Sequence, residues 1–313
     1  MKPSEEFLFS NILQVSTKEG PETTVPKNTF SPTLDGIFSR NPPQLLFHYT
    51  SPAGLIGIIC DKCVRATNVS HVNDPKEIQF AVDTAKFILY ELIHENSQTA
   101  EERELIQTLY AQAGTTSLGY YVFSLTEERD LLSQWRAYCQ PGGGYAIGFP
   151  SAHLAAMASV QKFHLWPCIY GSPVSIIISE MISAFRKSYH ERRESGMDQH
   201  EARKKIALKF AQHLAYYGSV MKQDAFNEER EWRLIGKIDE GHSQLCFRPG
   251  KNGIVPYFNF FLVNDENPNL VDVNGQKTTV VSGPGVDQFA LQLFLTKHLP
   301  GASRSSSRAQ YRW

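Results

Sequence analysis

The sequence predicts an α+β fold built on a central, largely antiparallel sheet. Hydrophobic residues make up 42% of the 313 residues and aromatic residues 12%, which is enough to bury a sizeable core. Strand-like segments are not regularly interleaved with helices, as a doubly wound parallel sheet requires, and many of them cluster late in the chain. The frames G-x-G-x-x-G, between a strand and a helix, and G-x-x-x-x-G-K-[ST] are absent, so the Rossmann and P-loop classes lose their main support.

The first folded segment begins at residues 45–50, whose sequence LLFHYT is typical of a strand. Ser51 and Pro52 follow as an N-cap and a first-turn proline, which predicts a helix directly after this strand. A long helix is expected after Asn73-Asp74-Pro75, because apolar residues then recur at helical spacing. Thr99 and Glu102 predict a capping box for the next helix.

The remaining elements follow from the same local signals. Asn274-Gly275 is a favourable hairpin turn, and the glycine run 142–144 permits a tight turn into a strand. The expected strands are 120–126, 144–149, 231–236, 244–248, 255–263, 270–273 and 277–283, and the expected helices are 173–193, 198–219 and 287–299.

Proline usage divides the chain into two parts. Residues 1–43 hold 6 of the 17 prolines, together with polar clusters such as TKEGPETTVPKN. This composition predicts a loosely structured N-terminal leader that makes few long-range contacts. Residues 44–313 are expected to form a single α+β domain.

Charge and hydropathy exclude several classes of function. Lys and Arg number 31 against 32 Asp and Glu, and this net charge of −1 argues against a chain built mainly to coat nucleic acid. No apolar run approaches the ~18 residues of a membrane span, and the first residues lack a signal-peptide layout. The 5 cysteines are an odd, thinly spread set, which is typical of a reducing compartment. We therefore expect a protein without a membrane partner that is cytoplasmic, or is delivered to a target cell without a classical signal peptide.

No metal site is expected. Cys60 and Cys63 form a C-x-x-C pair, but a structural zinc needs four ligands and no second such pair is present. The pair also falls at the end of an expected helix, whereas a redox pair sits at the start of a helix after a strand. We interpret both residues as ordinary reduced cysteines.

Glu229 and Glu231 are candidates for chemistry. Side chains two apart on a strand point to one face, so both carboxylates are expected to project together while Arg230 points away. Adjacent like charges are costly, and chemistry or cation binding justifies that cost. Arg233 lies on the same face, so an ion pair on a solvated edge strand is the alternative.

Polar residues at the end of the first strand, and between two later strands, are candidates for ligand binding. His48, Tyr49 and Thr50 close the first strand where the chain leaves the sheet. The alternative for His48 is a structural histidine whose hydrogen bonds are satisfied. Trp135 and Arg136 have the chemistry to sandwich a planar ring, or alternatively to pin the core.

A basic cluster occupies the two expected helices at 173–193 and 198–219. Acidic residues are interspersed with it, as on many surface helices, and contact with phosphate or nucleic acid is the alternative. The basic residues are Arg186, Lys187, Arg192, Arg193, Arg203, Lys204, Lys205 and Lys209.

Short motifs occur in a fixed order along residues 44–313. They are F-H-Y-T-S, N-D-P-x-E, F-S-L-T with S-Q-W-R-A-Y, G-Y-A-I-G-F, E-x-E-W-R, F-R-x-G-x-x-G-I-V-P-Y and V-S-G-P. This ordered set resembles an uncharacterised bacterial domain family of unknown function, which in turn looks like distant kin of the ADP-ribosyltransferase superfamily. The resemblance implies a split, mainly antiparallel sheet with flanking helices around a cleft for NAD+.

The resemblance also implies a role for each matched position. Members of the superfamily carry an Arg or His on an early strand, a Ser or Tyr on a second strand and a catalytic Glu, often as Glu-x-Glu, on a late strand. His48 and Ser124 match the first two positions, while Glu231 matches the catalytic glutamate and Glu229 its upstream partner. The implied site has catalytic Glu231 and Glu229, with His48, Tyr49, Thr50, Ser124, Trp135 and Arg136 binding NAD+.

The activity that the resemblance implies is transfer of ADP-ribose from NAD+ to a protein or nucleic-acid acceptor, or NAD+ hydrolysis when water is the acceptor. Cleavage of the nicotinamide–ribose bond develops an oxocarbenium ion, which a nearby carboxylate stabilises. A toxin, an effector and a phage-defence component are the biological roles that fit. The alternative is a non-catalytic module that binds a nucleotide or a partner protein on the same fold.

Overall fold

The computed structural model describes residues 31–72, 76–96, 98–115, 119–139, 143–238, 241–250, 253–265, 270, 272–273 and 275–309. The chain divides into two compact units, each assembled from three separate segments. The helical unit comprises residues 1–40, 76–117 and 169–223, and the sheet unit comprises residues 41–75, 118–168 and 224–313. The helix start expected at Asn73-Asp74-Pro75 lies outside the described residues, and the single domain over 44–313 stays a prediction.

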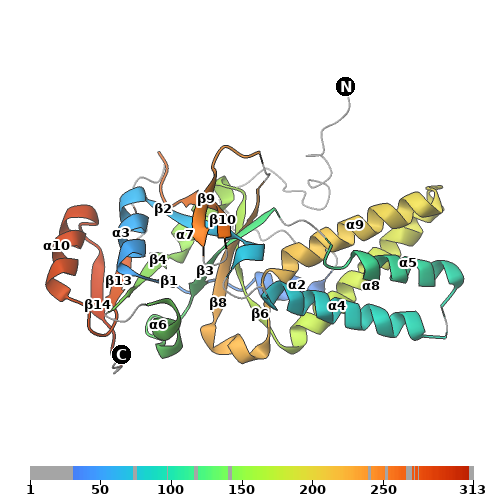
Figure 1. Ribbon diagram of the computed structural model, residues 1–313, viewed down its shortest axis with the longest axis horizontal. Coiled ribbons are helices and arrows are strands. Elements are labelled where there is room, and N and C mark those ends of the chain that lie inside the picture. The colour runs from blue at the N-terminus through green and yellow to red at the C-terminus, as the bar shows by residue number, and fades with distance from the viewer. Residues whose placement is uncertain are drawn as a thin grey trace. The chain divides into compact units, whose positions relative to one another are not determined.

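The described part of the helical unit is built on long helices that pack along their apolar faces (Figure 1). Thr99 caps α5 as predicted, because its hydroxyl accepts a hydrogen bond from the N–H of Glu102 at 3.2 Å. The Glu102 carboxylate does not complete the capping box, since this buried charge pairs with Arg186 at 2.5 Å and with His190 at 2.7 Å. The helices are α4 (Lys76–His94), α5 (Ala100–Gln112), α8 (Ser172–Glu194) and α9 (Gln199–Gly218), with a short parallel pair of strands β6 (Ile169–Tyr170) and β7 (Met221–Lys222).

Ion pairs compensate much of the basic cluster on α8 and α9. Arginines of both helices contact glutamates on α5, and two lysines contact glutamates one turn away on their own helix. This arrangement favours the interpretation of a solvated, charge-paired helix surface. The pairs are Arg193 with Glu101, Arg203 with Glu104, Lys187 with Glu191 and Lys205 with Glu201.

The end of the predicted leader is a packed helix, α2 (Pro32–Phe38). Ser31 caps α2, and its hydroxyl also contacts the carboxylate of Glu180 on α8. Leu34 is fully buried and Phe38 is 4% exposed, because the spacing of four residues places both on one face of the helix. This segment therefore makes the long-range contacts that its proline content argued against.

Within its described residues the sheet unit holds a ten-stranded, mainly antiparallel sheet with flanking helices, which confirms the predicted fold class. Its path is β14-β13-β4-β1-β3-β2-β10-β9, while β8 pairs with β3 and β5 pairs with β8. Only β13 and β14 pair in parallel within this sheet, as far as the described residues extend. The strands are β1 (Leu45–Thr50), β2 (Cys63–Asn68), β3 (Tyr120–Thr126), β4 (Tyr145–Pro150), β5 (Phe163–Pro167), β8 (Glu231–Lys237), β9 (Leu245–Gly250), β10 (Gly253–Phe261), β13 (Thr279–Ser282) and β14 (Ser303–Ser306).

The helices of the sheet unit complete its core. The first follows β1 directly, with Ser51 as its N-cap and Pro52 at its first position, as predicted. β11 (Asp272–Val273) and β12 (Gln276–Lys277) pair as an antiparallel hairpin, and Gly275 of the predicted turn adopts φ 79°, while Asn274 lies outside the described residues. The helices are α3 (Pro52–Asp61), α6 (Leu132–Tyr138), α7 (Ser151–Val160) and α10 (Gln288–His298).

The sheet splits between β1 and β3. β1 pairs with β4 along its whole length but meets β3 at a single position, where Phe47 lies opposite Thr126. β3 pairs along its whole length with β8, so β1 and β2 share its other edge. On that edge β2 pairs only with Tyr121 and Val122. Among the described residues, the stretch around Ser124 therefore has no strand on this edge, although it pairs with β8 on the opposite edge.

The packing of α2 gives a stability prediction. Leu34→Ala removes a fully buried side chain, so we expect the free energy of unfolding to fall by about 2–5 kcal/mol. Gly36→Ala is the matched control on the same helix, since nothing lies within 4 Å of the added Cβ, and we expect a gain of about 0.5–1 kcal/mol. Chemical denaturation of the full chain measures both values. An unchanged free energy for Leu34→Ala would mean that α2 does not pack.

Candidate functional site

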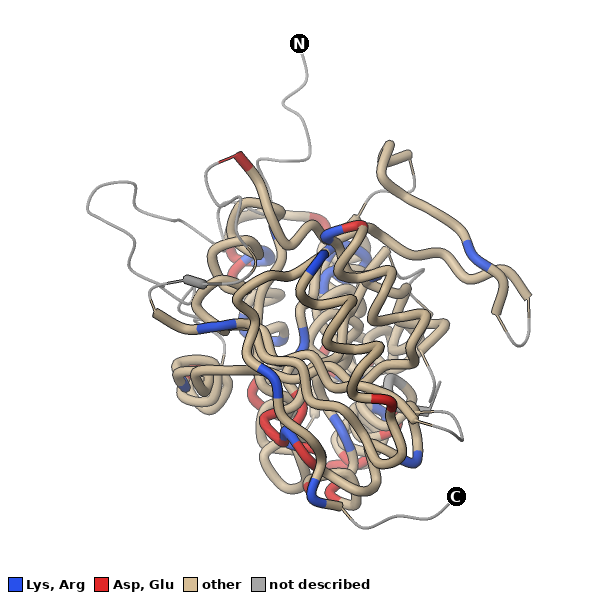
Figure 2. Tube along the Cα trace, turned by 90° about the vertical axis from the view of Figure 1, so that its left-hand side faces the viewer, with Lys and Arg blue, Asp and Glu red and all other residues tan. Residues whose placement is uncertain are grey.

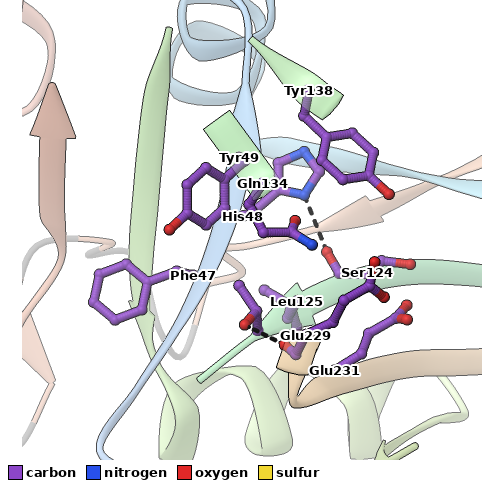
Figure 3. Close-up of a pocket in the computed structure, with 10 residues that line it drawn as sticks. Phe47, His48, Tyr49, Ser124, Leu125, Gln134, Tyr138, Glu229 and Glu231 are labelled. Carbon is purple, nitrogen blue, oxygen red and sulfur yellow. Dashed lines mark hydrogen bonds between the residues drawn. The ribbon is translucent and has the colours of Figure 1, made fainter. Parts of the chain in front are cut away.

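A pocket in the sheet unit lies at the split between β1 and β3 (Figure 3). It encloses about 40 Å³, which is room for a few water molecules, so it accommodates the end of a ligand and not a whole dinucleotide. Its lining comes from β1, β3, α6, and the residues before and at the start of β8. The lining residues are Phe47, His48, Tyr49, Ser124, Leu125, Thr126, Gln134, Tyr138, Glu229 and Glu231.

The pocket brings together most of the residues that the sequence singled out. His48, Tyr49, Ser124, Glu229 and Glu231 all line it. They come from segments that are far apart in the chain, and antiparallel pairing of β3 with β8 places Ser124 and Glu231 on adjacent strands. The other candidates, Thr50, Trp135 and Arg136, are not among its lining residues.

His48 fills the gap that the split leaves beside β3. Its Nδ1–H donates a hydrogen bond to the carbonyl oxygen of Ser124 at 3.0 Å, and its ring packs on Phe123 with centroids 4.3 Å apart. Because a carbonyl oxygen only accepts, this contact assigns the ring proton to Nδ1 and leaves Nε2 as an acceptor. Burial lowers the pKa of His48 to about 4, despite the opposing effect of the Ser124 hydrogen bond, so the ring is neutral at pH 7.

Glu231 is held by a buried ion pair. The Nε of Arg233 donates to one carboxylate oxygen at 2.6 Å, and a terminal nitrogen donates to the other at 3.2 Å. Both side chains are almost fully buried, with 6% of Glu231 and 3% of Arg233 exposed. This bidentate pair fixes the orientation of the carboxylate. Arg233 is therefore a partner of Glu231, as the alternative interpretation predicted, but the pair is buried and does not lie on a solvated edge strand.

The backbone conformation that places Glu229 in the pocket differs from the predicted strand. β8 begins at Glu231, and Glu229 ends a 3₁₀ helix over Asp224–Glu229, so strand alternation does not relate the two carboxylates. Arg230 between them adopts φ 40°, in the left-handed region that non-glycine residues rarely occupy. Figure 3 shows both glutamate side chains extending into the same part of the site.

The loop after β3 secures this unusual backbone. The hydroxyl of Thr126 donates to the carbonyl oxygen of Glu229 at 2.5 Å and accepts from the N–H of Glu128 at 3.0 Å. The N–H of Glu127 donates to the carbonyl of Arg230 at 3.2 Å, while the guanidinium of Arg230 pairs with the Glu128 carboxylate at 3.0 Å. The position of Glu229 therefore depends on residues 126–128.

Tyr49 and Trp135 serve mainly as supports. The Tyr49 hydroxyl donates to the carbonyl of Glu128 at 2.9 Å and accepts from the N–H of Leu131 at 2.8 Å. Trp135 is fully buried and packs edge-on against Tyr49 with ring centroids 4.6 Å apart. These contacts leave neither ring exposed for stacking on a ligand, so of the two interpretations of Trp135 the geometry favours the one in which it pins the core.

Asp130 connects the wall of the pocket to the C-terminal segment. It accepts hydrogen bonds from Trp135 Nε1 at 2.8 Å, from the Ser307 hydroxyl at 2.5 Å and from the N–H of Arg308 at 2.7 Å. Arg129 adds a bond to the Ser305 hydroxyl at 2.7 Å. Figure 2 shows charged residues of both signs gathered beside the segment that leads to the C-terminus.

Two residues of the pocket wall received no role in the sequence analysis. Gln134 and Tyr138 both line the pocket from α6, while Trp135 on the same helix points into the core. Their spacing of four residues puts them on one face of the helix. A helical interpretation of the stretch S-Q-W-R-A-Y would therefore have predicted that both side chains lie on the same side. Arg136, which the sequence favoured, is exposed on α6 and lies away from that face.

The structure provides no metal centre and no membrane span in the part of the chain that it describes. No group of three or more His, Cys, Asp or Glu side chains there is arranged to hold a metal ion. None of the 5 cysteines, all of which lie among the described residues, forms a disulfide, and this includes Cys60 and Cys63. No described helix is both long and apolar enough to cross a bilayer.

The architecture defines an α+β protein with a carboxylate- and histidine-lined pocket at a split in its sheet. Comparison with family models finds a DUF2971 domain, described as a protein of unknown function, at residues 134–234. This segment runs from Gln134 on α6 through both pocket glutamates, and it agrees with the uncharacterised domain family that the motifs resemble. Neither the curated proteins nor the solved structures contain a match.

The geometry of His48 predicts an unusual titration. We expect its pKa near 4 and the neutral Nδ1–H form at pH 7, as measured by ¹⁵N NMR of the imidazole. The His48→Asn variant assigns the resonance while retaining a donor for the Ser124 carbonyl. Because the usual pKa of 6.5 applies to the unfolded chain, the contribution of His48 to stability is complete above pH 6.5 and is lost as the pH falls toward 4. Titration near 6.5, or a proton on Nε2, would contradict this assignment.

The contacts of Asp130 predict an acid-sensitive link to the C-terminal segment. Desolvation opposes ionisation of Asp130, but hydrogen bonds from Ser307, Arg308 and Trp135 hold its pKa below the usual 3.8. Its stabilising contribution is therefore present above pH 3.8 and is lost as the pH falls through the lower folded-state pKa.

Asp130→Asn tests this link, because the amide cannot accept all three hydrogen bonds. We expect Asp130→Asn to lower the unfolding midpoint at pH 7, and we expect the difference from wild type to shrink below pH 3.8. Thermal unfolding across this pH range measures the effect, with Asp61→Asn on the exposed end of α3 as the control. If the difference in unfolding midpoint between Asp130→Asn and wild type is the same at every pH, the charge of Asp130 does not stabilise this link.

Proposed function

We propose that this chain cleaves the nicotinamide–ribose bond of NAD+ and transfers ADP-ribose to a protein or nucleic-acid acceptor, or to water. The observation that carries the proposal is the convergence of His48, Ser124 and Glu231 on one pocket from three strands. These are the residue types that the motif resemblance assigns to NAD+ binding and catalysis. The resemblance to ADP-ribosyltransferases also supports the roles of toxin, effector or phage-defence component.

The pocket suits the reacting end of NAD+. A pocket of about 40 Å³ holds only part of such a ligand, so the adenosine end lies outside the pocket in this proposal. Neutral His48 offers Nε2 as an acceptor for a ribose hydroxyl, because its Nδ1–H is committed to the Ser124 carbonyl. A neutral ring also places no positive charge beside the developing oxocarbenium ion.

Glu231 supplies the negative charge that bond cleavage requires. Nicotinamide leaves with the bonding electron pair, and the ribose carbon becomes positively charged in the transition state. Arg233 aligns the Glu231 carboxylate by donating to both of its oxygens, and a carboxylate oxygen accepts more than one hydrogen bond. The carboxylate then stabilises the cation and accepts a hydrogen bond from the ribose.

Glu229 is placed to act on the acceptor. The acceptor hydroxyl, or water, forms the new bond to the ribose carbon and gives up a proton to the Glu229 carboxylate. Glu229 is partly exposed whereas Glu231 is buried, which suits a group that meets an incoming acceptor. The distinction between transfer and hydrolysis then rests on whether an acceptor excludes water from Glu229.

A second candidate function is a non-catalytic module that binds a nucleotide or a partner protein. The observation that favours it is the buried bidentate pair between Glu231 and Arg233, which has the geometry of a structural ion pair. The two candidates differ in what happens when both charges of the pair are removed.

A single and a double variant separate these functions. Glu231→Gln leaves Arg233 buried without its counter-charge, so we expect a loss of about 3–5 kcal/mol in unfolding free energy. We also expect NAD+ cleavage to fall by about 10²–10³-fold, since one preorganised electrostatic contact is lost. In Glu231→Gln combined with Arg233→Met, we expect stability to recover while cleavage stays low.

Nicotinamide release and denaturation midpoints of the full chain provide the measurements. Glu229→Gln is the companion variant, in which we expect transfer to an acceptor to fall while hydrolysis partly survives. Recovery of both stability and cleavage in the double variant would remove Glu231 from the chemistry. Absence of cleavage by the wild type would leave the binding module as the better candidate.

A further inference from the structure

Gln134 has an unusual environment in the wall of the pocket. Its side chain is only 8% exposed, yet within the described residues its amide makes no hydrogen bond. No amide atom of Gln134 is among the described buried polar atoms that lack a partner, so the amide is open to the pocket, where water or a ligand supplies its hydrogen bonds. Figure 3 shows the amide end of Gln134 pointing into the pocket, where a ligand is able to supply the missing partners.

Trp135, the neighbour of Gln134, anchors the helix that carries this amide. Trp135 is fully buried, its Nε1–H is bonded to Asp130 and its ring packs on Tyr49. One turn further along α6, Tyr138 also lines the pocket with 40% of its surface exposed. The helix α6, which carries the amide, is therefore anchored before any ligand arrives, and a rigid element is the preferred support for selective recognition.

The chemistry of the amide defines the group that it recognises. A primary amide presents an acceptor oxygen and a donor nitrogen in one plane, and its complement is a second carboxamide in the opposite orientation. A carboxylate offers two acceptors and no donor, so it leaves the Gln134 oxygen without a partner. Glu229 and Glu231 in the same pocket add repulsion against a carboxylate, and neutral His48 adds no attraction.

We propose that Gln134 recognises the carboxamide of the nicotinamide ring and makes the pocket selective for NAD+ over its acid analogue, nicotinic acid adenine dinucleotide. This inference rests on the proposed function, and it adds the group that selects the substrate. Gln134 acts as a specificity-determining residue and takes no part in bond cleavage.

Binding measurements on the full chain test this assignment with four probes: NAD+, nicotinic acid adenine dinucleotide, ADP-ribose and free nicotinamide. We expect wild type to bind NAD+ at least about tenfold more tightly than the acid analogue. Gln134→Met, which keeps the length of the side chain, is expected to bring this ratio close to one while leaving the affinity for ADP-ribose unchanged. Gln244→Met, at an exposed position of the same unit, is the control and is expected to keep the wild-type ratio.

The unfolding midpoint gives an independent readout. Replacing an amide without hydrogen bonds by Met is expected to leave the midpoint unchanged or to raise it, whereas loss of a structural hydrogen bond lowers it. Should Gln134→Met fail to fold, Gln134→Leu takes its place, and we expect the same loss of preference for NAD+ over the acid analogue.

Each outcome separates this inference from the proposed function. A preference for NAD+ that persists in Gln134→Met overturns the inference and leaves the proposed function intact. Binding of nicotinamide that is lost in Gln134→Met, without any NAD+ cleavage by wild type, supports the inference and overturns the proposed function. If the wild type binds neither NAD+ nor nicotinamide, the inference and the proposed function are both overturned.

Discussion

The separation of β1 from β3 is the constraint on which the candidate site depends. A continuous sheet would cover the carbonyl of Ser124 with a backbone partner and would leave no room for a pocket. In this chain the two strands meet only where Phe47 faces Thr126, and the imidazole of His48 takes the place of the missing backbone donor. The hydrogen bond that satisfies the split sheet thus also fixes the ring proton on Nδ1 and leaves Nε2 available to a ligand.

Local signals predicted much of the fold, and what they missed depends on tertiary partners. The cap at Ser51, the cap at Thr99 and the hairpin at Gly275 follow from side-chain chemistry within a few residues. β14, with the sequence SRSS, has no apolar pattern and is a strand only because β13 offers an open edge. The packed helix α2 was missed for a similar reason, since α8 supplies the partner for its cap.

For the site, the sequence identified residues better than it explained their placement. Glu229 and Glu231 do meet in one pocket, but a left-handed residue at Arg230 brings them there and not the alternation of a strand. Local sequence cannot reveal that backbone, because Thr126 and Glu127 from a distant strand and its following loop hold it. Arg233 was recognised as a partner of Glu231, whereas the burial of their ion pair emerged only with the fold.

The most direct test of the account is an experimental structure of the full chain with a cleavage-resistant analogue of NAD+. The account predicts that the nicotinamide ribose lies in the split between β1 and β3, with a ribose hydroxyl on Nε2 of His48 and the Glu231 carboxylate beside the reacting carbon. An analogue bound elsewhere on the chain, or a split filled by protein side chains in the bound state, would contradict it.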